Sequence, residues 1–290
     1  MRNSATQRPE FERSPALPAG FGDIEQPRPL PAKLWGNEAV RKFTIILVLF
    51  AIWQLGSKYY SNNIAFPSVT ETFQAFWENL RSLEILKATW SSLQVLSVGY
   101  ALGVALACIL SIIATFTRIG RDILETLTAM FSPLPAIALV PLALMWFGLG
   151  SPKAMIFVLI HSVLWPVALN MHSGFRSSGT TLRMVGQNYG LGPIRFVFKI
   201  LIPASFASIL TGLKIGWAFA WRTLIAAELV FGSNGDQGGL GWFIFAAKNT
   251  LDTSAVFAGL LMVIVIGLLV ENLVFRTIEH KTVRKWGMQT

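Results

Sequence analysis

The sequence has almost no cysteine and no motif for binding a nucleotide or a metal ion. Its 290 residues include one cysteine, Cys108, so no disulfide can form within the chain. The G-x-x-x-x-G-K-[ST] loop that cradles nucleotide phosphates does not occur. No His/Cys set has metal-ligand spacing, and no nucleophile-elbow motif occurs. We therefore expect no catalytic residue, no metal site, no bound cofactor and no ATP hydrolysis by this chain.

Charged residues are also scarce, and long apolar runs take their place. Only 13% of the residues are charged and 53% are hydrophobic, with a mean hydropathy of +0.55. These values indicate an integral membrane protein. Runs that suit membrane-spanning helices cover residues 43–59, 90–116, 124–148, 154–174, 205–231 and 254–275. The predicted fold is an all-α membrane protein with about six transmembrane helices.

The two ends of the chain lack such runs. Residues 1–40 hold six of the fourteen prolines, which predicts a disordered tail. Residues 41–276 form the predicted transmembrane domain, and residues 277–290 form a second tail. Residues 60–88 mix apolar and charged side chains, so we expect an amphipathic helix at the outer membrane interface.

Prolines and glycines mark two of the predicted spans. Pro133, Pro135 and Pro141 lie in one span, where three prolines break or kink a helix and leave carbonyls without donors. That span should be shielded by neighbouring helices or line a cavity. Gly99 and Gly103 form a G-x-x-x-G pair in the preceding span, which allows two helix backbones to approach closely.

The distribution of basic residues predicts the orientation in the membrane. Seventeen of the 24 Lys and Arg residues lie before the first span, between the second and third spans, between the fourth and fifth spans and after the last span, whereas the other three loops hold four. The positive-inside rule therefore places both termini and residues 177–203 in the cytoplasm. Because this asymmetry explains the basic charge, we do not expect nucleic acid as a partner.

Residues 177–203 are too polar for lipid and too regular for an open loop. Residues 181–188 can form two helical turns, and Gly190 suits the left-handed position that ends a helix. Pro193 suits the first turn of a second helix, which we expect to stop at Pro203. The predicted unit is a helix, a glycine turn and a helix, which has the form of a docking element.

The predicted span of residues 205–231 contains the charged residues Lys214, Arg222 and Glu228, and a charge at membrane depth needs a partner or water. Arg222 and Glu228 are six residues apart on one helix, about 120° around it, and are not expected to pair with each other. Arg222 either attracts or gates an anionic substrate, or it pairs with a neighbouring helix or with carbonyls freed by proline. Glu228 suits a structural or gating contact better than a substrate contact. Together with the three prolines, Arg222 and Glu228 are the candidates for a translocation path or gate. Lys214 lies near enough to the cytoplasmic side to extend to the interface.

Other polar and aromatic residues in the spans have simpler interpretations. We expect His161 and His172 to make helix-packing hydrogen bonds rather than to relay protons. Trp146, Phe147 and Trp165 are interpreted as interfacial or core aromatic residues.

The loop of residues 177–203 resembles the cytoplasmic loop of the permease subunits of ATP-binding-cassette importers. That loop reads E-A-A, three residues, Gly, nine residues, Ile, one residue, Leu-Pro. Gly190 and Ile200 keep this spacing, whereas Ile202-Pro203 replaces Leu-Pro and Met184-Val185-Gly186 replaces E-A-A. In the family, the loop inserts into a groove on the ATPase subunit and carries its motion into the membrane. Glycine in place of alanine should weaken the first helix by up to about 1 kcal/mol. The implied ATPase-coupling loop includes Leu182, Met184, Val185, Gly186, Gly190, Ile200, Ile202 and Pro203.

Three other stretches resemble the nitrate, sulfonate, taurine and bicarbonate branch of these permeases. They are WRTLIAAE from Trp221 to Glu228, Gly238 to Gly241 with the aromatic residues that follow, and PLPAIALVPLALMWFG in the proline-rich span. The resemblance implies a type I ABC importer permease of the bacterial cytoplasmic membrane, with a cytoplasmic helix-turn-helix coupling loop. It implies a second copy of the chain, two cytoplasmic ATP-binding subunits and a periplasmic or lipid-anchored substrate-binding protein as partners. ATP would be bound by the partner subunits.

The expected function is ATP-driven import of a small anion, such as nitrate, a sulfonate, taurine or a similar organic acid. An aromatic carboxylate or a vitamin precursor is an alternative substrate, because the branch imports these too. An ion-coupled secondary transporter needs membrane-depth acids and usually an inverted repeat, whereas the sequence offers one candidate acid and no repeat. A membrane scaffold would not need a proline-broken span or a buried Arg222.

Overall fold

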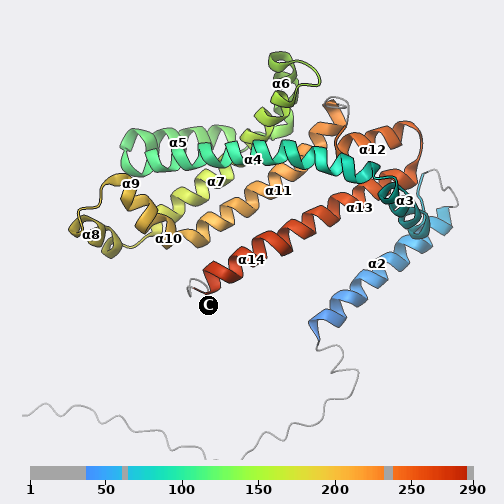
Figure 1. The fold of residues 1–290 in the computed structure, drawn as a ribbon, viewed down its shortest axis with the longest axis horizontal. Coiled ribbons are helices and arrows are strands. Elements are labelled where there is room, and N and C mark those ends of the chain that lie inside the picture. The colour runs from blue at the N-terminus through green and yellow to red at the C-terminus, as the bar shows by residue number, and fades with distance from the viewer. Residues whose placement is uncertain (1–36, 61–64, 232–237, 286–290) are drawn as a thin grey trace, which may run out of the picture. The chain divides into compact units, whose positions relative to one another are not determined.

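A computed structural model describes residues 37–60, 65–231 and 238–285 (Figure 1). The described chain is helical and contains no strand, which confirms the predicted all-α fold. Its contacts divide residues 1–53 from residues 54–290, and the two units are considered separately. Most of helix α2 (Glu38–Tyr60) belongs to the first unit. The predicted disordered tail, residues 1–40, lies almost wholly outside the described residues.

The second unit contains all the other helical elements. In chain order they are α3 (Val69–Arg81), α4 (Glu84–Phe116), α5 (Arg118–Phe131), the 3₁₀ turn η1 (Ala136–Leu139), α6 (Val140–Phe147), α7 (Pro152–Ser177), α8 (Thr180–Asn188), α9 (Pro193–Phe196), the π-helical segment η2 (Val197–Leu201), α10 (Ile202–Ala204), α11 (Phe206–Phe231), α12 (Leu240–Asn249), α13 (Thr253–Leu269), the π-helical segment η3 (Val270–Phe275), α14 (Arg276–Glu279) and the π-helical segment η4 (His280–Arg284). In the described chain, four helices are long and apolar enough to cross a membrane, or up to six if each of two bent helix pairs forms one span. The predicted number of about six agrees with the upper value.

Helix α7 lies at the centre of the second unit and contacts α4 through the predicted glycine pair. A Cβ on Gly99 would lie 2.7 Å from the Cβ of Leu159, and a Cβ on Gly103 would lie 2.7 Å from the Cβ of Val163. Both distances are shorter than side chains tolerate, so the two backbones are as close as glycine allows. The predicted close approach at this G-x-x-x-G pair is confirmed, and α7 is the helix that approaches.

Helix α11 packs on α7 in the same way. A Cβ on Gly212 would lie 2.8 Å from the Cβ of Asn170, and a Cβ on Gly216 would lie 2.9 Å from a methyl carbon of Val167. The hydroxyl of Tyr100 on α4 donates a 2.9 Å hydrogen bond to the carbonyl of Leu213 on α11. Helices α4, α7 and α11 therefore form one closely packed group.

The proline-rich span is broken, as predicted. The axis turns by 88° between α5 and the segment formed by η1 and α6. Pro133 and Pro135 lie in the break between these helices, whereas Pro141 lies in the first turn of α6. Proline is tolerated in a first turn because its missing N–H would have no partner there. Only two of the three prolines therefore contribute to the break.

Two helix boundaries on the N-terminal side differ from the predictions. The expected amphipathic helix of residues 60–88 is shorter: α3 begins after a capping box, in which Glu71 N–H donates to Ser68 Oγ and Ser68 N–H donates to Glu71. Helix α4 already begins at Glu84, before the predicted start of its span at residue 90, because the chain turns at Leu83 with a positive φ of 64°. The amphipathic stretch therefore belongs to two helices.

The C-terminal side also contains more helix than predicted. Helix α12 lies between the fifth and sixth predicted spans, where no helix was predicted. The last span continues without a break through η3, α14 and η4, beyond its predicted end at residue 275. Phe275 and Val283 are buried against Leu210 of α11, so packing on α11 supports this extension.

The glycine contacts predict a selective loss of stability. Gly103→Ala places a methyl group 2.7 Å from Val163 Cβ and 3.3 Å from the Ile160 carbonyl, and overpacking of this kind costs about 1–3 kcal/mol. We expect a lower midpoint of thermal unfolding for the purified protein in detergent, measured by size-exclusion chromatography after heating. Gly179→Ala is the matched control, because a Cβ there meets no atom within 4 Å. Equal midpoints for the two variants would contradict the packing argument.

Candidate functional site

Residues 180–204 form a helical hairpin between α7 and α11, with α8 as one arm and α9, η2 and α10 as the other (Figure 1). We call this unit the 180–204 hairpin. Helix α8 begins one residue before the predicted start at Thr181 and ends at Asn188, as predicted. The chain therefore forms the expected helix, turn and helix.

The turn of the hairpin is a glycine-terminated helix end. Gly190 has a φ of +61°, where a residue with a Cβ is strained. Its N–H donates to the carbonyl of Gln187 at 2.9 Å, and the N–H of Leu191 donates to the carbonyl of Gly186 at 3.0 Å. These two bonds form the Schellman pattern, which satisfies carbonyls that a helix end leaves without donors. The predicted role of Gly190 in ending α8 is confirmed.

Gly186 has a second role that its helix propensity does not reveal. It is buried, and a Cβ there would lie 2.5 Å from two ring carbons of Phe196 and 3.2 Å from a methyl carbon of Ile200. Alanine, the residue of the family pattern at this position, would therefore press against the second arm. The glycine that replaces alanine brings the two arms of the hairpin into direct contact.

The second arm fixes the hairpin to the membrane helices. Val197 and Leu201 are fully buried against Met171 and Phe175 of α7 and Ile209 of α11. On the first arm, a guanidinium nitrogen of Arg183 donates to the carbonyl of Phe175 at 3.2 Å. The hairpin is therefore packed directly on α7 and α11.

The prediction that Pro203 stops the second helix is wrong. The π-helical segment η2 leads into α10, Pro203 lies in the first turn of α10, and the helix ends after Ala204. Proline is accommodated there because it lacks only an N–H. Ile202 is half-buried against the cluster that anchors the arm, whereas Pro203 is exposed.

The hairpin exposes several large apolar side chains among polar and basic ones. Those at least 40% accessible are Leu182, Met184, Val185, Tyr189, Ile194 and Phe198. Three of these, Leu182, Met184 and Val185, belong to the predicted coupling loop. Apolar side chains gathered at the tip of a polar loop are typical of an interaction surface.

Among the residues that the structure describes, Arg222 pairs neither with a neighbouring helix nor with carbonyls freed by proline. Its Nε donates to the carbonyl of Ala218 on the same helix at 3.0 Å, and its guanidinium carbon lies 5.4 Å from the ring centroid of Phe219. The side chain is exposed, and it forms no ion pair with a described residue. The structural interpretation of Arg222 requires a partner on another helix, and the described residues provide none.

Glu228 is a buried connection between three helices. It is 1% exposed on α11. The hydroxyl of Ser92 on α4 lies 2.7 Å and 2.8 Å from its two oxygens, and the N–H of Gly241 in the first turn of α12 donates to it at 2.7 Å. The N–H of Leu240 donates to Ser92 Oγ at 2.8 Å. Ser92 and Glu228 thus satisfy two of the N–H groups that the start of α12 leaves free.

The glycines near Glu228 explain why two sequence stretches occur together. A Cβ on Gly239 would overlap the Glu228 carboxylate, and a Cβ on Gly241 would lie 2.6 Å from Glu228 Cβ. The WRTLIAAE stretch and the G-G-L-G stretch are therefore two halves of one packing arrangement. Neither Ser92 nor α12 was predicted as part of it, because nothing near Ser92 in the sequence indicates a buried partner.

A cavity of about 310 Å³ lies at the break between α5 and η1, against α7 and α11. Pro133 and Pro135 line it, and Pro141 is not part of its lining. Thr223 lines it from α11, next to Arg222 in the sequence. The predicted residues of the translocation path therefore do not form one site. Pro133 and Pro135 line the cavity, and Arg222 is next to one of its lining residues in the sequence. Glu228 belongs instead to the buried connection with Ser92 and α12.

A comparison with protein-family models identifies the class of this chain. The inner membrane component of binding-protein-dependent transport systems matches residues 99–277, more than half of the chain. The chain belongs to this family of ABC transporter permeases. The matched region contains α7, the 180–204 hairpin, the cavity and Glu228.

Relatives with curated names place the permease in the nitrate, sulfonate and taurine branch of the family. An ABC transporter permease protein of Methanocaldococcus jannaschii is 30% identical over 87% of this chain and 94% of its own length. The aliphatic sulfonates transport permease protein SsuC of Escherichia coli is 29% identical over 83% of this chain and 90% of its own length. The nitrate import permease protein NrtB of Synechocystis is 26% identical over 88% of this chain and 94% of its own length.

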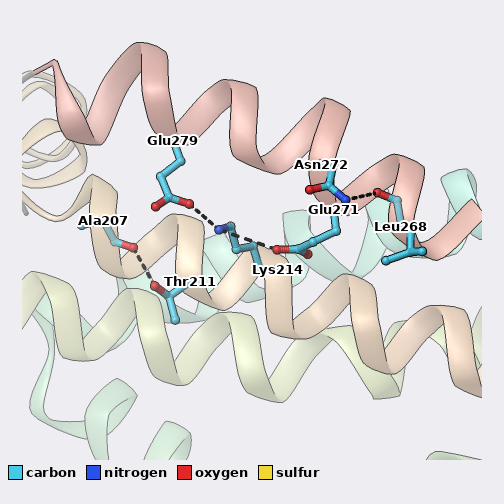
Figure 2. A network of polar contacts seen from close by, with 7 residues as sticks. All are labelled: Ala207, Thr211, Lys214, Leu268, Glu271, Asn272 and Glu279. Carbon is cyan, nitrogen blue, oxygen red and sulfur yellow. Dashed lines mark hydrogen bonds and ion pairs between the residues drawn. The ribbon is translucent and has the colours of Figure 1, made fainter. Parts of the chain in front are cut away.

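The permease also has an ion-pair network between α11 and the helical segment that follows α13 (Figure 2). The ammonium of Lys214 lies 2.6 Å from a carboxylate oxygen of Glu279 and 3.9 Å from one of Glu271. Both acids belong to the helical segment that follows α13. Lys214 therefore connects α11 to this segment.

Removing the hydroxyl of Ser92 tests the connection at Glu228. Ser92→Ala leaves Glu228 with one described donor and the Leu240 N–H without an acceptor, and each unpaired buried group costs about 1–3 kcal/mol. We expect a lower midpoint of thermal unfolding and faster proteolysis near α12. Ser97→Ala on the same helix is the control, because the exposed Ser97 hydroxyl donates only to the Leu93 carbonyl. A Ser92→Ala variant as stable as Ser97→Ala would rule out a structural role for this connection.

Proposed function

We propose that this permease is the membrane subunit of an ATP-driven importer that moves a small anion into the cytoplasm. The observation that carries the proposal is the 180–204 hairpin, which has a stiff glycine turn, an exposed apolar surface and a buried attachment to α7 and α11. Relatives named for nitrate and aliphatic sulfonates support an anionic substrate.

The proposed assembly contains two copies of the permease and two cytoplasmic ATP-binding subunits, with a periplasmic or lipid-anchored protein that delivers the substrate. A closed two-fold pair would form one pathway from two identical chains. ATP binds to the partner subunits, and the permease itself uses no cofactor and catalyses no reaction. The assembly lies in the bacterial cytoplasmic membrane. Both termini and the hairpin face the cytoplasm, in line with the distribution of basic residues.

The proposed mechanism uses the hairpin as a lever. ATP closes the two ATP-binding subunits and draws the two hairpins together. Because Val197 and Leu201 are buried between α7 and α11, this movement tilts both helices. The tilt changes the pathway from inward facing to outward facing, and the binding protein then releases its anion into the pathway. The glycine contacts make α4 move with α7.

Gly190→Val tests the lever without removing a membrane contact. Valine at a φ of +61° is strained, whereas a Cβ at this position meets no atom within 4 Å, so the hairpin is distorted and the spans are untouched. We expect normal membrane insertion and at least a tenfold loss of uptake per ATP hydrolysed, measured in proteoliposomes that contain the whole transporter. Gly192→Val is the matched control, because its φ is −64° and its Cβ position is equally open. Normal coupling in Gly190→Val would count against the lever.

A second variant tests the docking surface directly. Met184 is 55% exposed on α8, and Met184→Asp places a charge on the apolar surface without disturbing the hairpin core. We expect at least tenfold less ATP-binding subunit to be retained when the permease is purified by affinity tag. The control is Leu251→Asp, at an exposed position on the predicted outer side whose φ of 59° suits aspartate. Equal retention by both variants would show that this surface does not dock the partner.

A further inference from the structure

A second cavity lies between the end of α4 and the 180–204 hairpin, and we call it the hairpin cavity. Its volume is about 230 Å³. Thr115 and Phe116 line it from α4, Arg183 and Gln187 line it from α8, and Phe196 lines it from α9. Among the described residues of the lining, Arg183 is the one charged residue. The cavity thus combines an apolar wall with a small number of polar groups, which is typical of a binding site.

Arg183 and Gln187 provide the hydrogen-bond donors of this cavity. They are four residues apart on α8, so both lie on one face of the helix. A guanidinium nitrogen of Arg183 donates to the carbonyl of Phe175, and Arg183 forms no ion pair with a described residue. The side-chain amide of Gln187 has no hydrogen bond within the described chain. Both side chains are exposed, so their remaining N–H groups can donate to a ligand.

These donors differ from the unpaired groups of α7. The ring nitrogens of His161 and His172 form no hydrogen bond with a described residue, which contradicts the expectation that they make helix-packing hydrogen bonds. Each of these nitrogens is also completely covered by neighbouring atoms. The histidines therefore cannot reach a ligand, whereas Arg183 and Gln187 can.

The charge of the hairpin favours an anion. Residues 180–204 contain the basic residues Arg183, Arg195 and Lys199 and no Asp or Glu. The described lining of the hairpin cavity contains no acidic residue either. A guanidinium group binds phosphate strongly, because its planar array of N–H groups matches two phosphate oxygens.

An exposed apolar face of α4 leads to the hairpin cavity. This face consists of large apolar side chains that are each 43–54% accessible: Leu102, Leu106, Ile109, Ile113 and Phe116. Their alternating spacing of four and three residues places them on one side of the helix. Phe116 also lines the cavity, so the apolar face ends there. Because α4 is long and apolar enough to cross a membrane, hydrocarbon chains are the natural cover for this face.

The size of the hairpin cavity suits a headgroup rather than a whole lipid. Its volume of about 230 Å³ is below the range of roughly 300–1,000 Å³ that is usual for drug-sized ligands. A phosphate group with its glycerol therefore fits inside, and the acyl chains remain outside, on the apolar face of α4.

We propose that the hairpin cavity binds the headgroup of an anionic phospholipid, with the phosphate accepting hydrogen bonds from Arg183 and Gln187 and an acyl chain along the exposed face of α4. The site rests on the proposed function in one respect: the cytoplasmic position of the hairpin makes the inner leaflet the source of the lipid. Basic pockets on the cytoplasmic side of membrane helices bind such headgroups. The bound lipid connects α8 to the end of α4 and so stabilises the hairpin in the observed position.

Cysteine protection tests the site on the full chain, purified in a neutral detergent. Cys108→Ser removes the native cysteine, and Thr115→Cys places a thiol in the cavity lining. Alkylation by the neutral reagent N-ethylmaleimide is followed by mass spectrometry at increasing concentrations of dioctanoyl phosphatidylglycerol. We expect alkylation to become at least fivefold slower. Tyr189→Cys is the control, because position 189 is 80% exposed and does not line the cavity, and its alkylation should not change.

Two further compounds identify the group that is bound. Dioctanoyl phosphatidylcholine has the same chains on a headgroup without net charge, and inorganic phosphate has the anion without a chain. We expect each to slow alkylation less than twofold at the same concentration. Equal protection by phosphatidylcholine would show that the chains alone bind, and equal protection by phosphate would show a site for a soluble anion. Either result would overturn the assignment.

The donors are tested in the Thr115→Cys background. Arg183→Gln removes the charge, and we expect half-protection to require at least about tenfold more phosphatidylglycerol. Arg195→Gln is the matched control, because Arg195 is an exposed cation of the same hairpin that does not line the cavity. An unchanged concentration in Arg183→Gln, or an equal shift in Arg195→Gln, would overturn the assignment.

A second variant separates ligand binding from folding of the hairpin. Arg183→Gln also removes the hydrogen bond to the Phe175 carbonyl, whereas Gln187→Leu keeps that bond and nearly the same side-chain size. We expect Gln187→Leu to raise the concentration for half-protection at least about threefold. If Arg183→Gln does not fold, an unchanged concentration in Gln187→Leu overturns the assignment.

The outcome for this site is independent of the outcome for the importer. The assay uses neither ATP nor the ATP-binding subunit, so failure of protection in a permease that still couples ATP hydrolysis to uptake overturns the lipid site alone. Protection in a permease whose uptake survives loss of the ATP-binding subunit supports the lipid site and contradicts the proposed function. If the purified ATP-binding subunit protects the thiol at position 115 without lipid, the subunit occupies the cavity and the lipid assignment is wrong.

Discussion

The close approach of three helix backbones is the constraint on which the rest of the second unit depends. Gly99 and Gly103 allow the backbones of α4 and α7 to approach closely, and Gly212 and Gly216 do the same for α11 and α7. In a membrane, apolar side chains gain nothing by leaving lipid, so such close contacts supply much of the packing energy. With α7 held on both sides, its remaining face is free to form the wall of a cavity, and its C-terminal end is fixed enough to carry the 180–204 hairpin.

A buried polar connection performs the corresponding role at the other end of α11. Glu228 and Ser92 receive the start of α12 and join it to α4 and α11. The bonds are made in a protein interior where an unpaired carboxylate would be costly, so the connection is stable only while all three helices are present. Helix α12 is short, and its position is defined by these few hydrogen bonds together with the two glycines that make room for the carboxylate.

Features encoded by neighbouring residues could be predicted from the sequence, and features that need a distant partner could not. The Gly190 turn, the break at Pro133 and Pro135, and the G-x-x-x-G approach each follow from the conformational limits of glycine or proline. The partner of Glu228 is Ser92, 136 positions away, and no local pattern connects them. Gly186 was interpreted through helix propensity alone, because its contact with Phe196 exists only once the hairpin has folded.

The ion pairs of Lys214 attach the helical segment that follows α13 to α11. The Lys214 ammonium pairs with the carboxylates of both Glu271 and Glu279. Phe275 and Val283 of the same segment are buried against Leu210 of α11. Any rotation of α11 must therefore either carry the last helix with it or separate charges that are only partly exposed to water. The helical segment that follows α13 is thus coupled to α11, and a label on this segment would report a rotation of α11.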